Sequence, residues 1–138
     1  MATSTRFFGR YEHALDLKGR VILPAKLRTH FTQPGFLTRH LEGCLGLWTN
    51  EEFDKEVSAR LEEAEHDALA RNRVREWSAA VFEADIDRQG RIAIPPNLRS
   101  YAHLDQEVVI IGMINRVEFW SPEQWAAKDI GGDLEASL

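Results

Sequence analysis

The sequence lacks features that secreted, membrane and zinc-binding proteins share. It holds one cysteine, Cys44, so no disulfide can form within the chain and no thiolate cluster is available for zinc. We expect Cys44 to be a small buried apolar side chain. The longest apolar run, residues 108–114, has seven residues, far fewer than the roughly 20 that cross a bilayer. The N-terminus has no apolar signal region, because the apolar run between Arg6 and Arg10 is too short. These absences predict a cytoplasmic protein with no membrane partner.

The sequence also lacks the residue patterns typical of catalytic and cofactor-binding sites. The five histidines are scattered, without an H-x-x-x-H pair or a C-x-x-C partner, so we expect no metal site. The sequence contains no phosphate-cradling glycine loop and no G-x-S-x-G nucleophile elbow. We therefore expect no cofactor, and we expect that the protein is not an enzyme.

The composition is that of a folded protein whose charge is unevenly distributed. Hydrophobic residues make up 43% and charged residues 28% of the 138 residues, which fits one compact domain or two half-domains that share a core. The net charge is −5. However, residues 1–30 carry six Lys/Arg against two acids, whereas residues 51–67 carry two against eight. We interpret the acidic run as a solvated helix face and the basic segment as a surface that can meet a phosphate backbone.

A segment near the N-terminus is repeated in the second half of the chain. Residues 12–28 align with residues 83–99, and seven of the 17 positions are identical, where about one would match by chance. Farther along, residues 47–53 align with residues 119–125. Because no flexible Pro/Gly-rich linker separates the copies, we expect two tandem units that pack together.

Each copy is expected to contain the same order of elements. Residues 11–15 alternate in polarity and residues 20–23 are rich in β-branched side chains, so the turn at 16–19 predicts a hairpin. Pro24 then favours the start of a short helix over residues 25–31. In the second copy, Pro95 and Pro96 have the same place.

A second pair of strands and a helix should follow in each copy. The pair is clearest at residues 108–113 and 117–120, and its counterpart lies between Phe36 and Trp48. Thr49 with Glu52 has the spacing of a capping box that starts a helix, as do Ser121 and Gln124 in the second copy. The predicted organisation is a first unit over 7–53, a helical connector over 54–78, a second unit over 79–125 and a C-terminal tail over 126–138.

The connector shows helical periodicity, and it holds residues to which we assign no function. A second helical segment is expected from Arg71 to Trp77. We interpret Arg71, Arg73 and Arg75 as a solvated helix face rather than a second DNA contact, and we expect the four tryptophans in the core. The apolar positions at helical spacing are Phe53, Val57, Leu61, Ala64 and Ala68.

The pattern D-x-x-G-R, followed by a strand and a proline, occurs at the same place in both copies. In such a turn the aspartate accepts backbone N–H bonds and the glycine adopts positive φ. The turn would fix Arg20 and Arg91 near the base of a hairpin, while Lys18 and Arg88 project from it. The residues expected to organise the loops are Asp16, Gly19, Asp87 and Gly90.

Arginines held in this way suit DNA as a ligand. Guanidinium groups bind phosphate or the O6/N7 edge of guanine, and a β-ribbon fits the major groove. The alternative is that each Asp–Arg pair only stabilises its turn, and both roles can coexist. Two of the candidates, Lys26 and Arg28, are included for their charge alone. The candidate DNA-binding residues are Lys18, Arg20, Lys26, Arg28, Arg88, Arg91 and Arg99.

These motifs resemble those of the MraZ family, bacterial transcriptional regulators with two tandem AbrB-like (SpoVT-AbrB) units. The resemblance rests on residues 8–28, on their copy at 87–99, and on residues 109–112 leading to Phe119 and Trp120. It implies an α+β fold of swapped-hairpin (double-split) β-barrel units with short helices. It also implies a ring-shaped homo-oligomer associated with the nucleoid.

The family resemblance further implies binding to double-stranded DNA. The expected target is a set of short direct repeats upstream of the division and cell-wall gene cluster, including the protein's own gene. Family contacts would fall on Asp16, Lys18 and Arg20. The second copy departs from the pattern, because Gln89 and Asn97 replace the two lysines, so its contribution to DNA binding need not be equal.

Two other classes of function are alternatives. The first is an oligomeric scaffold or protein-interaction module whose basic loops bind acidic partners without specific DNA binding. The second is an enzyme, such as a phosphate-ester hydrolase that uses the Asp–Arg pairs.

Overall fold

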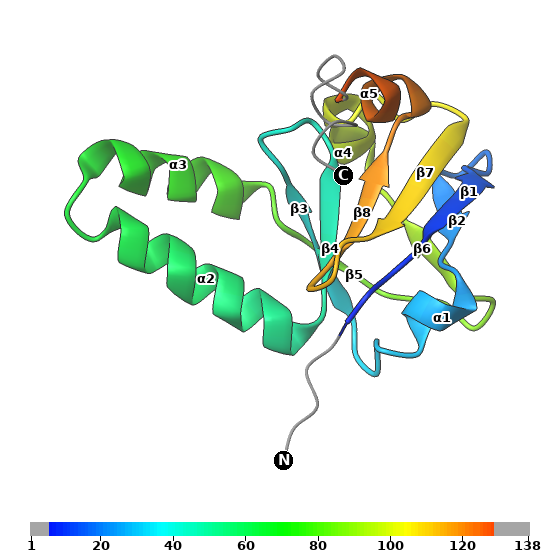
Figure 1. The fold of residues 1–138 in the computed structure, drawn as a ribbon, viewed down its shortest axis with the longest axis horizontal. Helices are drawn as coiled ribbons and strands as arrows, with labels where there is room; N and C mark the ends of the chain where they lie inside the picture. The colour runs from blue at the N-terminus through cyan, green and yellow to red at the C-terminus, as the bar shows by residue number, and fades with distance from the viewer. Residues whose placement is uncertain (1–5, 129–138) are drawn as a thin grey trace, which may run out of the picture.

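The computed structural model describes residues 6–128, and within this range the fold is mixed α+β with short helices around mostly antiparallel strands (Figure 1). The strands are β1 (Arg10–Ala14), β2 (Arg20–Ile22), β3 (Gly35–Arg39), β4 (Leu45–Trp48), β5 (Phe82–Ala84), β6 (Arg91–Ala93), β7 (Glu107–Gly112) and β8 (Val117–Trp120). The helices are α1 (Ala25–Arg28), α2 (Asn50–Ala64), α3 (Ala68–Ala79), α4 (Pro96–Tyr101) and α5 (Pro122–Ala127). Of the predicted C-terminal tail, residues 129–138 lie outside the described range.

The two repeats exchange strands with each other. A six-stranded sheet has the order β1-β7-β8-β4-β3-β5, so the first strand of each repeat pairs with a strand of the other repeat. β2 and β6 form a separate two-stranded ribbon. Exchanging the equivalent strands of the two repeats turns β1–β7 into β5–β3 and β7–β8 into β3–β4, and it leaves β4–β8 and β2–β6 unchanged. The fold therefore has an approximate internal two-fold symmetry.

The second strand pair expected in each repeat is present, since β3 pairs with β4 and β7 pairs with β8. The first hairpin expected in each repeat differs from the observed pairing. The turn at residues 16–19 forms, and the Asp16 N–H donates to the carbonyl of Arg20 at 2.8 Å. Beyond this bond the strands diverge, since β1 pairs with β7 while β2 pairs with β6. The backbone groups at the ends of β2 also form hydrogen bonds with the other repeat. Leu23 N–H donates to the Gly90 carbonyl at 2.8 Å, and Ile94 N–H donates to the Gly19 carbonyl at 3.0 Å.

The hydrophobic core belongs to both repeats at once. Val21 and Ile92 are paired on the inner face of the ribbon, and both are fully buried. Burying one such side chain stabilises a fold by about 1.5–3 kcal/mol. Equivalent side chains of the two repeats fill the rest of this cluster, including Leu23 with Ile94, Leu27 with Leu98, and Leu47 with Phe119. Neither repeat therefore encloses a core of its own.

Helices α2 and α3 form an antiparallel hairpin that projects from the sheet (Figure 1). The predicted helix start at Thr49 is confirmed, because the Thr49 side chain accepts a hydrogen bond from the Glu52 N–H at 3.3 Å. The Glu52 side chain pairs with Lys55 at 3.3 Å, so the reciprocal bond of a full capping box is not found among the described residues. Asp67 caps α3 in the same way, accepting from the Leu69 N–H at 3.0 Å. The connecting helix predicted to reach Ala68 ends at Ala64, because this second cap starts a new helix. Most acidic side chains of α2 are exposed, as expected.

Cys44 and most of the tryptophans lie in the core, as expected, whereas one helix is shorter than expected. Cys44 is fully buried, and this burial raises the pKa of its thiol. Three tryptophans are buried and the fourth, Trp125, is half-buried. Helix α1 is shorter than expected, since it ends at Arg28 and residues 29–31 continue only as turns. No helix in residues 6–128 is long and apolar enough to span a bilayer.

The strand exchange predicts that half of the chain cannot fold as a monomer. A fragment of residues 1–66 would expose the edge of β1 and the buried side chains that pack against the second repeat. We expect this fragment and the fragment 67–138 to be unfolded or self-associated when separate, and to regain native circular dichroism when mixed. As a control, the full chain cut at residues 65–67 after folding should stay associated. A folded monomer of either fragment would contradict the exchange.

Candidate nucleic-acid interface

The first D-x-x-G-R turn is held by one carboxylate. Asp16 Oδ1 accepts the backbone N–H groups of Lys18 and Arg20, both at 2.9 Å, and Oδ2 accepts the Nε–H of Arg20 at 2.8 Å. Gly19 has φ +76°, a conformation that other L-residues rarely adopt. The aspartate thus fixes the backbone of the turn and the direction of the arginine together.

The second turn repeats this geometry. Asp87 Oδ1 accepts the N–H groups of Gln89 and Arg91 at 2.9 Å, and Oδ2 accepts the Nε–H of Arg91 at 2.8 Å. Gly90 has φ +80°. Replacing a lysine by Gln89 leaves the turn unchanged because only the backbone of this position takes part. The expected pairing of aspartate with arginine is therefore present in both turns.

Both aspartates are ionised at neutral pH. The pKa of Asp16 and that of Asp87 are lowered from their ordinary value, first by the backbone hydrogen bond from Arg20 or Arg91 and then by the side-chain bond of the same residue. A lowered pKa in the folded state stabilises the turn above the ordinary value near 3.8. That stabilisation is lost only as the pH falls through the lowered value. The turns keep their geometry at neutral pH.

Each turn also receives an arginine from the opposite repeat. A Cβ atom added to Gly19 would lie 2.7 Å from Cζ of Arg99, and one added to Gly90 would collide with the guanidinium of Arg28. Arg28 Nη1 in addition donates to the Leu23 carbonyl at 3.1 Å. This crossed arrangement was missed by sequence reasoning, which included Arg28 for its charge alone. The signal available was the repeat itself, because Arg28 and Arg99 occupy equivalent positions.

The ribbon β2–β6 presents the two turn arginines on one face. Arg20 lies opposite Ala93, and Arg91 lies opposite Ile22. Because side chains alternate along a strand, these four residues share the outer face, while Val21 and Ile92 point into the core. Arg20 and Arg91 are each half-buried, and Ile22 and Ala93 are exposed.

The remaining candidates lie in exposed positions. Lys18 and Arg88 are exposed at the tips of the turns, as expected, and neither is in the interior. Lys26 is exposed on α1, and within residues 6–128 no ion pair or side-chain hydrogen bond ties it to either turn. Each turn thus brings together three cations and one aspartate. The two sets are Lys18, Arg20 and Arg99 with Asp16, and Arg88, Arg91 and Arg28 with Asp87.

The turns present cationic groups from which an anion could accept hydrogen bonds. Each aspartate bonds only the Nε of its arginine, and no other hydrogen bond from Arg20 or Arg91 side chains is found within the described residues. The outer Nη groups are therefore available to an acceptor. Among the described residues, no three His, Cys, Asp or Glu side chains are grouped so that they could hold a metal ion.

Comparison with known proteins identifies the family. The family model described as "MraZ protein, putative antitoxin-like" matches residues 7–75 and 79–128, which are the two repeats. The chain belongs to the MraZ family. The resemblance of the D-x-x-G-R motifs is thereby confirmed over most of the sequence.

Relatives with this family name share about two-fifths of their residues with the chain. The Transcriptional regulator MraZ of Thermomicrobium roseum is 43% identical over 124 residues, which are 88% of this chain and 86% of the relative. That of Halothermothrix orenii is 40% identical over 131 residues, or 95% and 88% of the two chains. That of Thermoanaerobacter sp. is 43% identical over 120 residues, or 85% and 82%.

The turn geometry predicts that Gly19→Ala destabilises the protein. Alanine in a left-handed conformation costs about 1–2 kcal/mol, and its Cβ would also displace Arg99. We expect the free energy of unfolding, measured by urea denaturation, to fall by at least that amount. Leu17→Ala in the same turn is the control and should change it by less than about 0.5 kcal/mol, since Leu17 is fully exposed. Equal stability of the two variants would contradict the required turn conformation.

Proposed function

We propose that the protein is a DNA-binding transcriptional regulator that reads double-stranded DNA with its two turns and the ribbon between them. The observation that carries this proposal is the arrangement of Arg20 and Arg91. Both are fixed through Nε by an aspartate, and both lie on the outer face of one short antiparallel ribbon. The names of the relatives support the same function.

The dimensions of the ribbon suit the major groove. Arg20 and Arg91 are offset by two residues along the ribbon, which corresponds to roughly 7 Å at the rise of a β-strand. The major groove is about 12 Å wide and admits a two-stranded ribbon. The Nη groups of both arginines can then reach guanine O6 and N7 or flanking phosphates. Lys18 and Arg88, at the tips of the turns, would contact phosphates.

The two turns should contribute differently. The first turn has Lys18 where the second has Gln89, and α1 carries Lys26 where α4 carries Asn97. The second turn in exchange has Arg88 where the first has Leu17, so each turn carries one cation at its tip but at a different position. We propose that the two turns therefore contact the phosphates of the DNA differently.

Assembly would allow an acidic chain to bind DNA. With a net charge of −5, one copy offers only a small basic face, so several copies on repeated sites would gain avidity. We propose that the targets are short direct repeats upstream of the division and cell-wall gene cluster, including the protein's own gene. Such a regulator would act in the cytoplasm, at the nucleoid.

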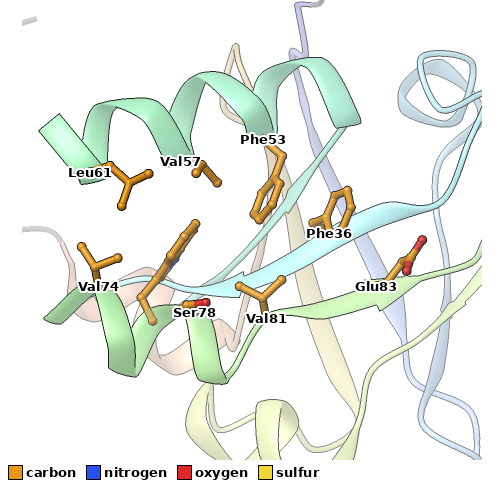
Figure 2. Close-up of a pocket in the computed structure, with 9 residues that line it drawn as sticks. Phe36, Phe53, Val57, Leu61, Val74, Ser78, Val81 and Glu83 are labelled. Carbon is orange, nitrogen blue, oxygen red and sulfur yellow. The ribbon is translucent and has the colours of Figure 1, made fainter. Parts of the chain in front are cut away.

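We further propose that the copies join into a ring through two different apolar surfaces. One is the hairpin groove, about 470 Å³ in volume, in which side chains of α2 and α3 face one another beside Phe36 (Figure 2). In this groove Leu61 remains 57% exposed. The other surface comprises Phe8, Met113 and Ile114, all exposed. Contact between unlike surfaces joins the copies head to tail. Such a chain of copies closes into a ring when the rotation from one copy to the next divides a full turn evenly.

The proposed DNA contact predicts a strong effect of Arg20→Ala. We expect this variant to weaken binding to the protein's own upstream DNA by roughly 10-fold or more, since charge-assisted hydrogen bonds contribute about 1.5–3 kcal/mol. The circular dichroism spectrum should not change. Fluorescence anisotropy at several salt concentrations measures the affinity, which should fall steeply as salt rises.

The control is Lys55→Ala, an exposed cation on α2 away from the turns, which should bind DNA like the wild type. The scaffold alternative predicts no preference for the upstream DNA over a scrambled duplex of equal length. Wild-type affinity of Arg20→Ala would exclude the ribbon as the binding face.

The ring predicts that charges in the hairpin groove dissociate the assembly. Val57→Glu combined with Leu61→Glu places two carboxylates in the groove. We expect light scattering after size-exclusion chromatography to show a smaller species, with DNA affinity reduced by two orders of magnitude through lost avidity. Ser58→Glu on the exposed side of α2 is the control and should leave the mass unchanged. A monomeric wild type at micromolar concentration would contradict the ring.

A further inference from the structure

Trp77, which borders the hairpin groove, also borders a second cavity with different chemistry. This cavity has a volume of about 330 Å³, within the range of small-molecule sites. One wall comes from the helical hairpin and includes Arg73. The opposite wall comes from β3, the turn after it and α4, and it includes Arg39 and Tyr101. The cavity therefore lies where the hairpin meets the body formed by the two repeats.

The cavity is positively charged in a protein that is negative overall. Three arginines line it against one glutamate, Glu76, whereas the whole chain has a net charge of −5. Arg60 is paired with Glu56 at 2.8 Å. Arg39 and Arg73 form no ion pair within residues 6–128. Two cationic groups are thus available to an anion.

Buried polar atoms around the cavity lack partners. Trp77 is only 8% exposed, and its Nε1 has no hydrogen-bond partner within the described residues. Arg39 Nε and His40 Nε2 are buried without partners as well, although His40 Nε2 lies beside Gly46 of β4. Burial lowers the pKa of His40 to about 4, so this ring is neutral at pH 7. Buried polar atoms without partners are rare in folded proteins because they lose their hydrogen bonds to water. Oxygen acceptors would satisfy the N–H groups of Trp77 and Arg39.

The walls between these groups are aromatic and apolar. The guanidinium of Arg60 lies 4.2 Å from the centroid of Trp77, and that of Arg39 lies 4.9 Å from the centroid of Tyr101. The Tyr101 hydroxyl donates to the carbonyl of His40 and so fixes this wall. Leu69, 61% exposed, adds apolar surface at the rim. A flat ring can pack on the outer plane of these guanidinium–aromatic stacks or against the edges of the two rings.

We infer that this cavity binds a small organic anion, with a flat apolar body against Trp77 and Tyr101 and a carboxylate or phosphate group at Arg39 and Arg73. Because its walls belong to both the hairpin and the body, the bound molecule connects these two parts and holds the angle between them. Arg73 thereby gains a role that the interpretation of a solvated helix face did not include. The inference is independent of the proposed DNA contact, which uses other residues.

Isothermal titration calorimetry of the full-length protein without DNA tests this site. The probes are benzoate and phenyl phosphate, which combine a ring with each of the two anionic groups. Inorganic phosphate provides the charge without a ring, and benzyl alcohol provides the ring without a charge. We expect benzoate or phenyl phosphate to bind saturably, at least 10-fold more tightly than inorganic phosphate or benzyl alcohol. Whichever of the two ring anions binds more tightly shows whether the site prefers a carboxylate or a phosphate group.

Variants locate the binding. Arg39→Gln and Arg73→Gln should each weaken the tighter probe by roughly 10-fold, the effect of losing one charge-assisted contact. Arg75→Gln, on the same helix but outside the cavity, should leave the affinity within two-fold. Trp77→Phe keeps an aromatic wall and removes Nε1, so it should weaken binding less than the arginine variants. Absence of binding by both ring anions, or equal effects of Arg73→Gln and Arg75→Gln, would overturn the inference.

Discussion

Three residues of β2 pair with three residues of β6, and this short ribbon joins the two repeats on the side where the turns lie. Its inner side chains, Val21 and Ile92, are buried in the common core, so the ribbon cannot shift by one residue without exposing both. Its ends are fixed by backbone bonds from each repeat to the glycine carbonyl of the other turn. The positions of all turn cations follow from this pairing.

The aspartate and the arginine of each turn have a structural role and leave room for a functional one. Asp16 uses three of its acceptor sites for the turn itself, and only one of them involves the side chain of Arg20. The guanidinium is held at Nε, and no hydrogen bond from its outer nitrogens is found within residues 6–128. Fixing a side chain before binding reduces the entropy lost on forming a complex. Stabilising the turn and preparing the arginine are therefore consequences of one contact.

Local features of the fold could be predicted from the sequence, whereas pairings between distant segments could not. The Asp–Gly turns, the helix cap at Thr49 and the strand at 117–120 depend on neighbouring residues, and all are present. The alternation of residues in a strand shows which face is buried but does not name its partner, so exchange between repeats was not visible in the pattern of residues 11–23. The resemblance to the MraZ family supplied it instead. For the same reason, the contact of Arg28 with the second turn and the cavity beside Arg73 emerged only from the structure.

The approximate two-fold symmetry has a consequence for how the protein could lie on DNA. Two identical subunits related by a two-fold axis favour palindromes, because both halves must meet the same bases. Here both halves belong to one polypeptide, and they differ at Lys18 against Gln89 and at Lys26 against Asn97. Each half can therefore change independently of the other. A face whose two ends carry different side chains has a polarity, so a row of such faces can distinguish one direction along the duplex from its reverse.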